Sequence, residues 1–212
     1  MKQNSMRIAL LGSPRTGSQS LYDFIANHLS FDNYIMESEP FNYHWRHDVG
    51  LEQLDTIFFS NHKNVFIKTF IDEVHIPSIF QSDLKSYWDW FFGYFDKIIL
   101  LDRIDKVSQS ESFLYHNKQS NLKSWHKKEY YNLSNITKLE IEDLVNKLSV
   151  ESQKLFEYSQ IGYPLFFYED IYIQKNKNKI IEMFEYIGIT LDDELYKKYI
   201  LSSKLKVRKT LI

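Results

Sequence analysis

The sequence contains no cysteine among its 212 residues. Disulfide bonds and metal sites built from thiolates are therefore excluded, and a reducing compartment is favoured. No hydrophobic run reaches the roughly 18 residues of a membrane-spanning helix, and the segment before the first glycine-rich loop is too short for a signal peptide. We therefore expect a soluble, cytoplasmic protein that does not span a membrane.

A strong excess of one charge is also missing. Lys and Arg total 26 against 28 Asp and Glu, for a formal net charge of −2, which provides no general attraction to nucleic acid or to an anionic surface. Hydrophobic residues nevertheless make up 43% of the chain and aromatic residues 17%, enough to bury a core. We expect one folded domain over residues 1–212, with any basic site confined to a small region.

Apolar runs alternate with amphipathic stretches, a pattern typical of β-α units around a mostly parallel sheet. Buried strands are predicted at residues 6–12, 64–70, 97–103 and 164–170, with a weaker one at 33–38. Amphipathic helices are predicted to begin at two capping residues, Ser18 and Thr137. The apolar face of the second helix comprises Ile141, Leu144, Val145, Leu148, Leu155 and Phe156.

The first loop has the glycine spacing of a phosphate-binding loop but lacks its lysine. Gly12 and Gly17 hold the two glycine positions of G-x-x-x-x-G, and Ser18 and Gln19 follow where an ATP-binding loop places Lys and then Ser or Thr. Arg15 stands inside the loop instead, and its guanidinium matches phosphate oxygens. Backbone N–H groups at a helix start also attract anions. The pattern predicts an anion site, although an ordinary strand-turn-helix uses the same residue types.

The stretch SPRTGSQSL resembles the 5′-phosphosulfate loop of the PAPS-dependent sulfotransferases. These enzymes use 3′-phosphoadenosine 5′-phosphosulfate (PAPS) without Mg²⁺, so the resemblance accounts for the missing lysine. It implies a P-loop-type three-layer α/β domain with a central, mostly parallel sheet flanked by helices. It also implies donor-binding roles for Pro14, Arg15, Thr16, Gly17, Ser18 and Gln19. Arg15 would in addition neutralise the charge that develops on the bridging oxygen as the sulfonate leaves.

The stretch IILLDRIDKVSQSES resembles the 3′-phosphate motif of the same family. Its residue pattern is most similar to that of the bacterial trehalose-sulfotransferase-like branch. Arg103 and a serine would hold the 3′-phosphate. At the usual serine position the chain has Glu111, with Ser110 and Ser112 on either side, and the R-x-D-K frame favours Ser112. Ile104 stands where a second arginine is common in that branch. Taken alone, the stretch also fits a plain helix N-terminus.

The stretch IMESEPFNYHW resembles the segment that leads into the acceptor pocket of this superfamily. Glu39 would then be the general base that removes the proton of the acceptor hydroxyl. Glu37, His44 and His47 are its rivals, and the two histidines lack a nearby third ligand for a metal site. The stretch VFIKTF resembles a strand whose lysine faces the active site, so Lys68 is a candidate contact to the sulfonate or the acceptor.

The basic C-terminal tail is a further candidate. A basic loop near the C-terminus often closes over the 3′-phosphate in this family, and Arg208 and Lys209, with Lys204 and Lys206, could do so here. A solvated run of charges is the equally simple alternative.

Two aromatic segments are predicted to be mainly structural. The block YWDWFFGYF at 87–95 fits a helix packed into the core, with Tyr87, Trp90 or Tyr94 left to face a ligand. The stretch PLFFYEDI resembles the late strand of the family, in which Tyr168 and Glu169 are structural by default.

Together these segments predict transfer of a sulfonate from PAPS to a hydroxyl of a small-molecule, carbohydrate or lipid acceptor, by in-line attack and without a metal. Two other functions are compatible with part of the pattern. A P-loop kinase would use ATP but needs a lysine after Gly17. A non-catalytic nucleotide-binding relative is favoured by Glu111 and Ile104. No nucleic-acid partner is expected, and the sequence assigns no oligomeric state.

Overall fold

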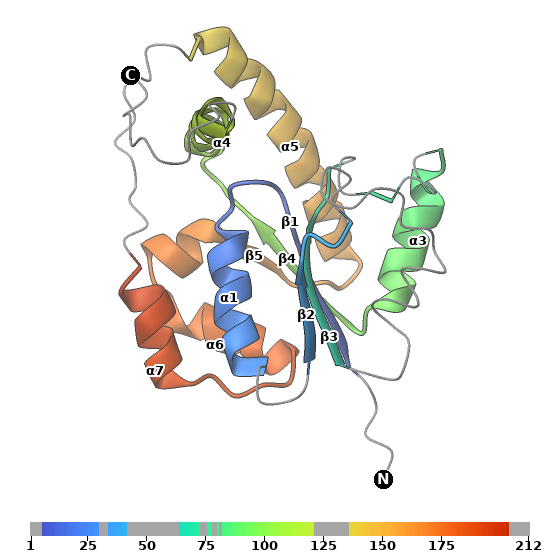
Figure 1. Cartoon of the computed structure of the whole chain (residues 1–212), viewed down its shortest axis with the longest axis vertical. Helices are drawn as coiled ribbons and strands as arrows, with labels where there is room; N and C mark the ends of the chain where they lie inside the picture. The colour runs from blue at the N-terminus through green and yellow to red at the C-terminus, as the bar shows by residue number, and fades with distance from the viewer. Residues whose placement is uncertain are drawn as a thin grey trace.

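The computed structural model describes residues 6–29, 34–41, 64–72, 76–77, 80, 82–120 and 136–203, with the backbone alone at 117–120. Within these residues, five strands form one sheet in which every neighbouring pair is parallel (Figure 1). The spatial order is β2-β3-β1-β4-β5. The strands are β1 (Arg7–Gly12), β2 (Tyr34–Ser38), β3 (Asn64–Phe70), β4 (Lys97–Asp102) and β5 (Leu165–Phe167).

The predicted strands are all present, and the predicted α/β class is confirmed. The strand predicted at 164–170 is shorter than expected, because the chain turns into the π-helix η6 (Glu169–Ile173) after Phe167. At that turn the carboxylate of Glu169 accepts hydrogen bonds from the backbone N–H groups of Ile104 and Asp105. The end of β5 therefore connects to the segment that follows β4 rather than extending the sheet.

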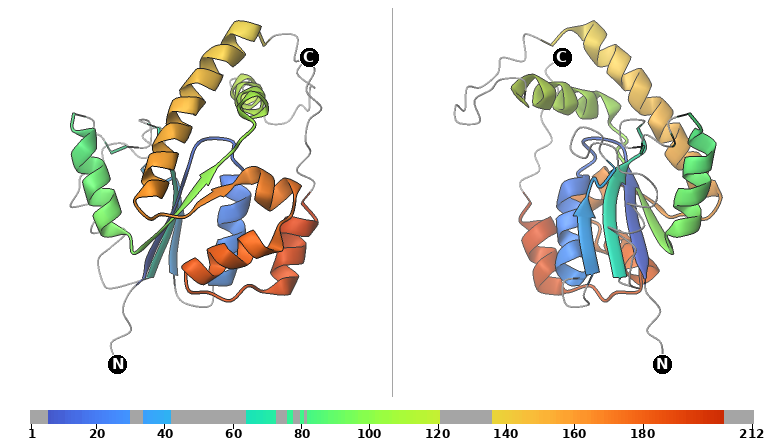
Figure 2. Two further views of the ribbon diagram at one scale, coloured as in Figure 1. Left: turned by 180° about the vertical axis from the view of Figure 1, so that it is seen from behind. Right: turned by 45° about the vertical axis from the view of Figure 1, so that its right-hand side comes forward.

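Helices cover both faces of the sheet (Figure 2). One face carries α1 (Ser18–Leu29), α6 (Lys177–Tyr186) and α7 (Asp193–Tyr196), followed by the π-helix η7 (Lys197–Leu201). The other face carries α3 (Leu84–Tyr94) and α5 (Lys138–Gln160), while α4 (Lys106–Ser120) lies over the end of the sheet at which β1 and β4 terminate (Figure 1).

The two faces of β1 belong to two separate halves of the core. Ile8 and Leu10 pack with α1, α6 and η6, whereas Ala9 and Leu11 pack with α3 and α5. All four side chains are fully buried. A parallel sheet requires such two-sided cover, which explains why its strands are nearly continuous apolar runs in the sequence.

The aromatic block forms most of α3 and packs into the core, as predicted. The expectation that Tyr87 could face a ligand is wrong, because its ring is fully buried between Phe80 and Phe91. Burial also raises the pKa of the Tyr87 hydroxyl far above its usual value. Trp90 and Tyr94 are partly buried against each other, and Trp90 stacks on Phe80.

The start of α5 is the predicted capping box. Thr137 Oγ1 accepts a hydrogen bond from the backbone N–H of Glu140, and Glu140 Oε2 accepts one from the backbone N–H of Thr137. Leu148 and Leu155 are buried, but Phe156 is 51% exposed, which corrects its placement on the core face. Leu148 and Leu155 are two helical turns apart and share one face, whereas Phe156 is one residue further around the helix.

Gly17 occupies a position that a side chain would strain. Its φ is +77°, and a Cβ atom built on it would lie 2.7 Å from Tyr172 Cε2. The hydroxyl of Tyr172 donates a hydrogen bond of 3.1 Å to the carbonyl oxygen of Gly17. The turn into α1 therefore depends on the close approach of an aromatic ring to a glycine backbone.

We expect Gly17→Ala to lower the free energy of unfolding by roughly 2–4 kcal/mol, since it combines a left-handed backbone with overpacking. Gly93→Ala is the matched control, because Gly93 lies in α3 with open space around it. That change should stabilise the helix by about 0.5–1 kcal/mol. Urea unfolding of the two variants measures both effects, and similar stability changes would contradict the role of Gly17.

Candidate functional site

The loop between β1 and α1, residues 13–17, is the candidate anion site, and two of its residues have a left-handed backbone. Arg15 has a φ of 64° and Gly17 a φ of 77°, both in the left-handed region. Turns of this kind point successive backbone N–H groups toward one side, and α1 begins directly afterwards at Ser18. The side chains of Arg15 and Gln19 are exposed, while Pro14, Thr16 and Ser18 are buried.

A buried polar network holds this loop from the side of α4. Gln109 Nε2 donates hydrogen bonds to the carbonyl oxygen of Pro14 at 2.6 Å and to Ser13 Oγ at 3.0 Å. Thr16 Oγ1 donates to the carbonyl oxygen of Ser13 at 2.9 Å, so this hydroxyl shapes the loop. Gln109 was not singled out from the sequence, although it is the glutamine of the R-x-D-K-V-x-Q stretch.

Asp102, at the end of β4, anchors the same network. Its carboxylate is 3% exposed and accepts hydrogen bonds from Ser13 Oγ at 3.4 Å and from Lys106 Nζ at 2.6 Å. The hydroxyl of Ser152 on α5 donates to its other oxygen. One buried carboxylate therefore links the loop, the start of α4 and the middle of α5.

Arg15 reaches from the loop to α4. Its Nε donates a hydrogen bond of 3.2 Å to Ser112 Oγ. Ser110, by contrast, is fully buried, and its hydroxyl donates to the carbonyl oxygen of Lys106 within the helix. Of the two serines that the sequence left open, the geometry favours Ser112 as the one that can meet a ligand beside Arg15.

Arg103 is held by the two residues that follow β5. Its guanidinium lies 4.6 Å from the ring centroid of Tyr168, and its Nε is 3.9 Å from Glu169 Oε1, too far for a hydrogen bond. Within the described part of the chain, this buried Nε has no hydrogen-bond partner. Glu169 meanwhile binds the backbone at the turn before α4, so the Tyr168-Glu169 pair orients Arg103.

Lys68 forms a buried ion pair with Glu39. The Lys68 side chain is 2% exposed, and its Nζ donates to Glu39 Oε1 at 2.6 Å and to Gln19 Oε1 at 2.8 Å. Ser38 Oγ also donates to Gln19 Oε1, at 3.1 Å. These contacts join the ends of β2 and β3 to the first turn of α1. They also compensate the high cost of burying an ammonium group.

The backbone of Glu39 is unusual for a residue with a side chain. Its φ is 55°, and its N–H donates a hydrogen bond of 2.7 Å to the carbonyl oxygen of Lys68. A left-handed conformation costs a non-glycine residue about 1–2 kcal/mol and recurs at functional sites. The Glu39 side chain remains 27% exposed, so a molecule arriving from solvent can reach it.

Several predicted residues lie outside the described part of the chain. They are the base rivals His44 and His47 and the tail residues Lys204, Lys206, Arg208 and Lys209. Among the residues that are described, no group of three or more His, Asp or Glu side chains is arranged to hold a metal ion. Within the same residues, no helix combines the length and hydropathy needed to cross a bilayer.

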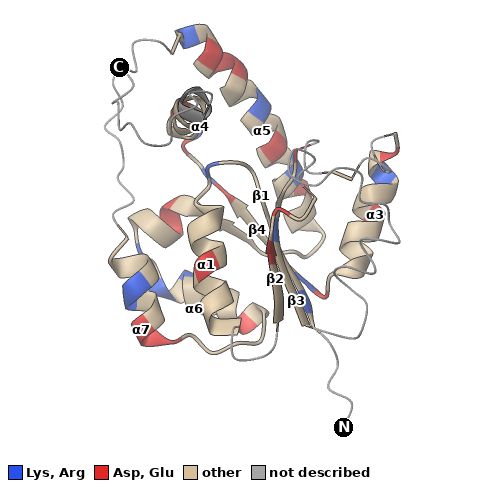
Figure 3. Cartoon of the chain, viewed as in Figure 1, with Lys and Arg blue, Asp and Glu red and all other residues tan. Residues whose placement is uncertain are grey.

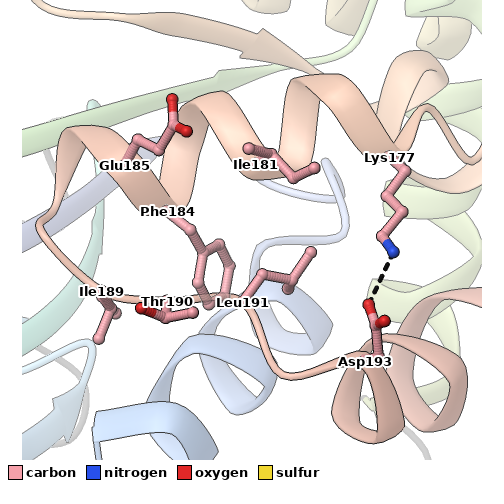
Figure 4. Close-up of a pocket in the computed structure, with 8 residues that line it drawn as sticks. All are labelled: Lys177, Ile181, Phe184, Glu185, Ile189, Thr190, Leu191 and Asp193. Atoms are coloured by element: carbon pink, nitrogen blue, oxygen red, sulfur yellow. Dashed lines mark hydrogen bonds and ion pairs between the residues drawn. The ribbon is translucent and has the colours of Figure 1, made fainter.

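A pocket away from these residues lies between α6 and the segment that leads into α7 (Figure 4). Its lining includes Ile181, Phe184, Ile189 and Leu191, with an ion pair of 2.7 Å between Lys177 and Asp193 at one end. The pocket lining includes neither Arg103 nor Glu39, and it includes no residue of the loop after β1. Figure 3 shows acidic and basic residues intermingled along α5.

Glu151 on α5 is a buried carboxyl that the sequence did not reveal. Its side chain is 5% exposed, and neither carboxylate oxygen has a hydrogen-bond partner in the described residues. Burial raises the pKa of Glu151 to about 7, and the nearby charge of Asp72 adds to the rise. A single glutamate on a long polar helix carries no signal that it will be enclosed.

Because the folded state holds a proton on Glu151 that the unfolded chain has lost, stability should fall as pH rises from about 5 to 7. Glu151→Gln should remove this loss and raise the free energy of unfolding at pH 8 by roughly 1–3 kcal/mol. Glu157→Gln, at an exposed position of the same helix, is the control. Urea unfolding between pH 5 and 8 tests this, and parallel pH profiles for wild type and Glu151→Gln would refute it.

Two solved sulfotransferase structures are similar to this chain. Mouse sulfotransferase SULT7A1 complexed with PAP superposes with a TM-score of 0.56 at 16% sequence identity, over 93% of this chain and 64% of the mouse chain. The sulfotransferase domain from the curacin biosynthetic pathway gives a TM-score of 0.49 at 14% identity, over 92% of this chain and 78% of that domain.

At 16% identity, the likeness to the mouse enzyme establishes the fold: this chain has the α/β architecture of a sulfotransferase. The chain spans 64% of the length of that enzyme. No protein-family model and no curated protein sequence matches it.

Proposed function

We propose that this protein is a PAPS-dependent sulfotransferase that acts on a hydroxyl of a small-molecule, carbohydrate or lipid acceptor. The main support is that the candidate groups meet at one edge of the sheet. The loop follows β1, Arg103 follows β4, Lys68 lies in β3 and Glu39 follows β2. Ligands of parallel α/β sheets bind at this carboxyl edge. The residue pattern around Arg103 favours membership of the trehalose-sulfotransferase-like branch of the family.

The residues present fit a bisphosphate nucleotide donor. The loop backbone and Arg15 would hold the 5′-phosphosulfate, and Arg103 with Ser112 would hold the 3′-phosphate. The buried Nε of Arg103, which has no hydrogen-bond partner among the described residues, is consistent with an anion site at this position. The donor supplies an electrophilic sulfonate on a phosphate leaving group. Arg15 then stabilises the negative charge on the leaving phosphate oxygen.

On the acceptor side, Glu39 takes the proton of the attacking hydroxyl. The oxygen–sulfur bond to the acceptor forms as the sulfur–oxygen bond to the phosphate breaks, and the proton moves to the Glu39 carboxylate. Lys68 holds Glu39 Oε1 in place and lies beside Gln19 at the first turn of α1. The pair therefore connects the proton acceptor to the loop that binds the donor.

The kinase alternative is disfavoured by the surroundings of Gln19. An ATP-binding loop uses a hydroxyl at this position to bind Mg²⁺. Here the position carries an amide whose oxygen accepts hydrogen bonds from Lys68 and Ser38. The non-catalytic alternative predicts the same nucleotide binding without turnover, so activity separates it from the enzyme.

We expect 3′,5′-adenosine bisphosphate to raise the melting temperature without divalent metal, because a ligand that binds only the native state stabilises it by mass action. Ser112→Ala should weaken the ligand roughly 10–100-fold, the scale of one charge-assisted hydrogen bond. Ser110→Ala is the matched control and should leave the affinity unchanged. Stabilisation by ATP only in the presence of Mg²⁺ would contradict the proposal.

Glu39→Gln should lower turnover ~10²-fold or more while donor affinity stays within about twofold, since general-base help has this scale. The acidic limb of the rate-versus-pH profile should vanish with it if that limb reports this base. Glu37→Gln, in the adjoining strand β2, is the control. Transfer of labelled sulfonate to a mixed pool of hydroxyl acceptors is the measurement. Full activity of Glu39→Gln would remove this residue from the mechanism.

A further inference from the structure

Each polar atom of the Gln109 side chain, on α4, has a hydrogen-bond partner. The side chain is fully buried. Its Nε2 donates to the carbonyl oxygen of Pro14 at 2.6 Å and to Ser13 Oγ at 3.0 Å, so both amide hydrogens are used on the loop after β1. Its Oε1 accepts a hydrogen bond of 3.3 Å from Lys106 Nζ. The amide therefore has one orientation, because the reversed one would set its oxygen against the Pro14 oxygen and its N–H groups against the Lys106 ammonium.

These contacts belong to a closed ring of hydrogen bonds. Lys106 Nζ donates to Asp102 Oδ1 at 2.6 Å, and Ser13 Oγ donates to the same oxygen at 3.4 Å. The ring runs from Ser13 to Asp102, Lys106, Gln109 and back to Ser13. Removal of one member leaves another buried group unpaired, at a cost above the net value of one hydrogen bond. The end of β4 and the start of α4 thus fix the direction in which Gln109 donates.

Gln109 acts on the loop through the carbonyl group of Pro14. This carbonyl and the N–H of Arg15 belong to one planar trans peptide, so a hydrogen bond to the oxygen fixes the orientation of the whole unit. Arg15 has a φ of 64°, and a residue with a side chain keeps such a conformation only where its surroundings impose it. Without the bond from Gln109, the peptide can rotate and turn its carbonyl oxygen toward a bound anion, which the oxygen repels.

The helix α4 meets the loop at two successive turns. Ser112, three residues after Gln109, accepts the hydrogen bond from Arg15 Nε. Figures 1 and 2 show α4 lying above the loop that joins β1 to α1. We propose that Gln109 is a positioning residue, which holds the loop in the orientation that binds the anionic group of the donor. A loop that populates other orientations binds its ligand more weakly, in proportion to its competent fraction. The identity of the donor rests on the proposed function, whereas the positioning of the loop does not.

Gln109→Met tests the loss of the two donors at nearly constant side-chain length. Because the Pro14 carbonyl is then left unpaired, the affinity for inorganic sulfate should fall roughly tenfold. The backbone amide resonances of the loop are followed by NMR as sodium sulfate replaces sodium chloride at equal ionic strength. Gln153→Met makes the same chemical change at an exposed position of α5, and this control should bind sulfate like the wild type.

Gln109→Glu separates positioning from packing. A protonated carboxyl group can donate to the Pro14 oxygen, whereas an ionised one only accepts hydrogen bonds. Compared with wild type at the same pH, this variant should bind sulfate roughly tenfold more weakly at pH 8. The deficit should shrink toward pH 5 as the introduced carboxyl takes up a proton, while the deficit of Gln109→Met should stay constant. Asp102 and Lys106, the charged groups of the ring, are the same in every variant, and sulfate keeps its charge over this range.

Two simpler effects would give different patterns. An effect of added charge alone would weaken Gln109→Glu and spare Gln109→Met. An effect of packing alone would lower stability in urea but would not produce a recovery of sulfate binding on protonation. Either pattern would overturn the role of Gln109. Because Gln109→Glu is compared at two pH values, the test holds even if Gln109→Met does not fold.

Calorimetry with 3′,5′-adenosine bisphosphate separates this proposal from the proposed function. Equal binding of the bisphosphate by wild type and Gln109→Met would overturn the role of Gln109 and leave the proposed function intact. The expected sulfate responses without any bisphosphate binding by wild type would keep the positioning role and reject the PAPS donor. If neither ligand binds to the wild type, both proposals are wrong.

Discussion

The hydrogen bonds from Gln109 to the loop after β1 set the geometry on which the candidate site depends. They fix the carbonyl of Pro14 against α4, and the buried Asp102 ties the same network to β4 and α5. Once these elements are joined, Arg15 can reach Ser112 across the gap between loop and helix. The loop is thus positioned by side chains of β4, α4 and α5 that form a buried polar network.

The second organising feature is the buried pair of Lys68 and Glu39. An ammonium group that is 2% exposed is tolerated only with close partners, and Glu39 and Gln19 supply them. Because Gln19 belongs to the first turn of α1, the pair connects the ends of β2 and β3 to the segment that follows the loop after β1. The left-handed backbone of Glu39 is the conformational cost of this connection.

Features that depend on neighbouring residues in the chain were predicted correctly, whereas a feature that depends on tertiary packing was not. The capping box of Thr137 was predictable, because its partner Glu140 lies three residues away. The turn at Gly17 was predictable because a positive φ is a local property that glycine favours. Tyr87 was misjudged as able to face a ligand, since helical spacing places it next to both buried and partly buried neighbours. Tyr87 is enclosed because Phe80 packs over α3 and contacts the Tyr87 ring.

The sequence by itself determined the alternation of strands and helices and the capped start of α5, since periodicity and capping are local properties. Tertiary structure alone decided that Ser112 rather than Ser110 meets Arg15, and that Lys68 binds Glu39. The first contact joins the loop after β1 to α4, 97 residues further along the chain, and the second joins β3 to the residue that follows β2, 29 residues before it. No local pattern encodes such pairs, because they form only when the crossover connections bring the carboxyl ends of the strands together.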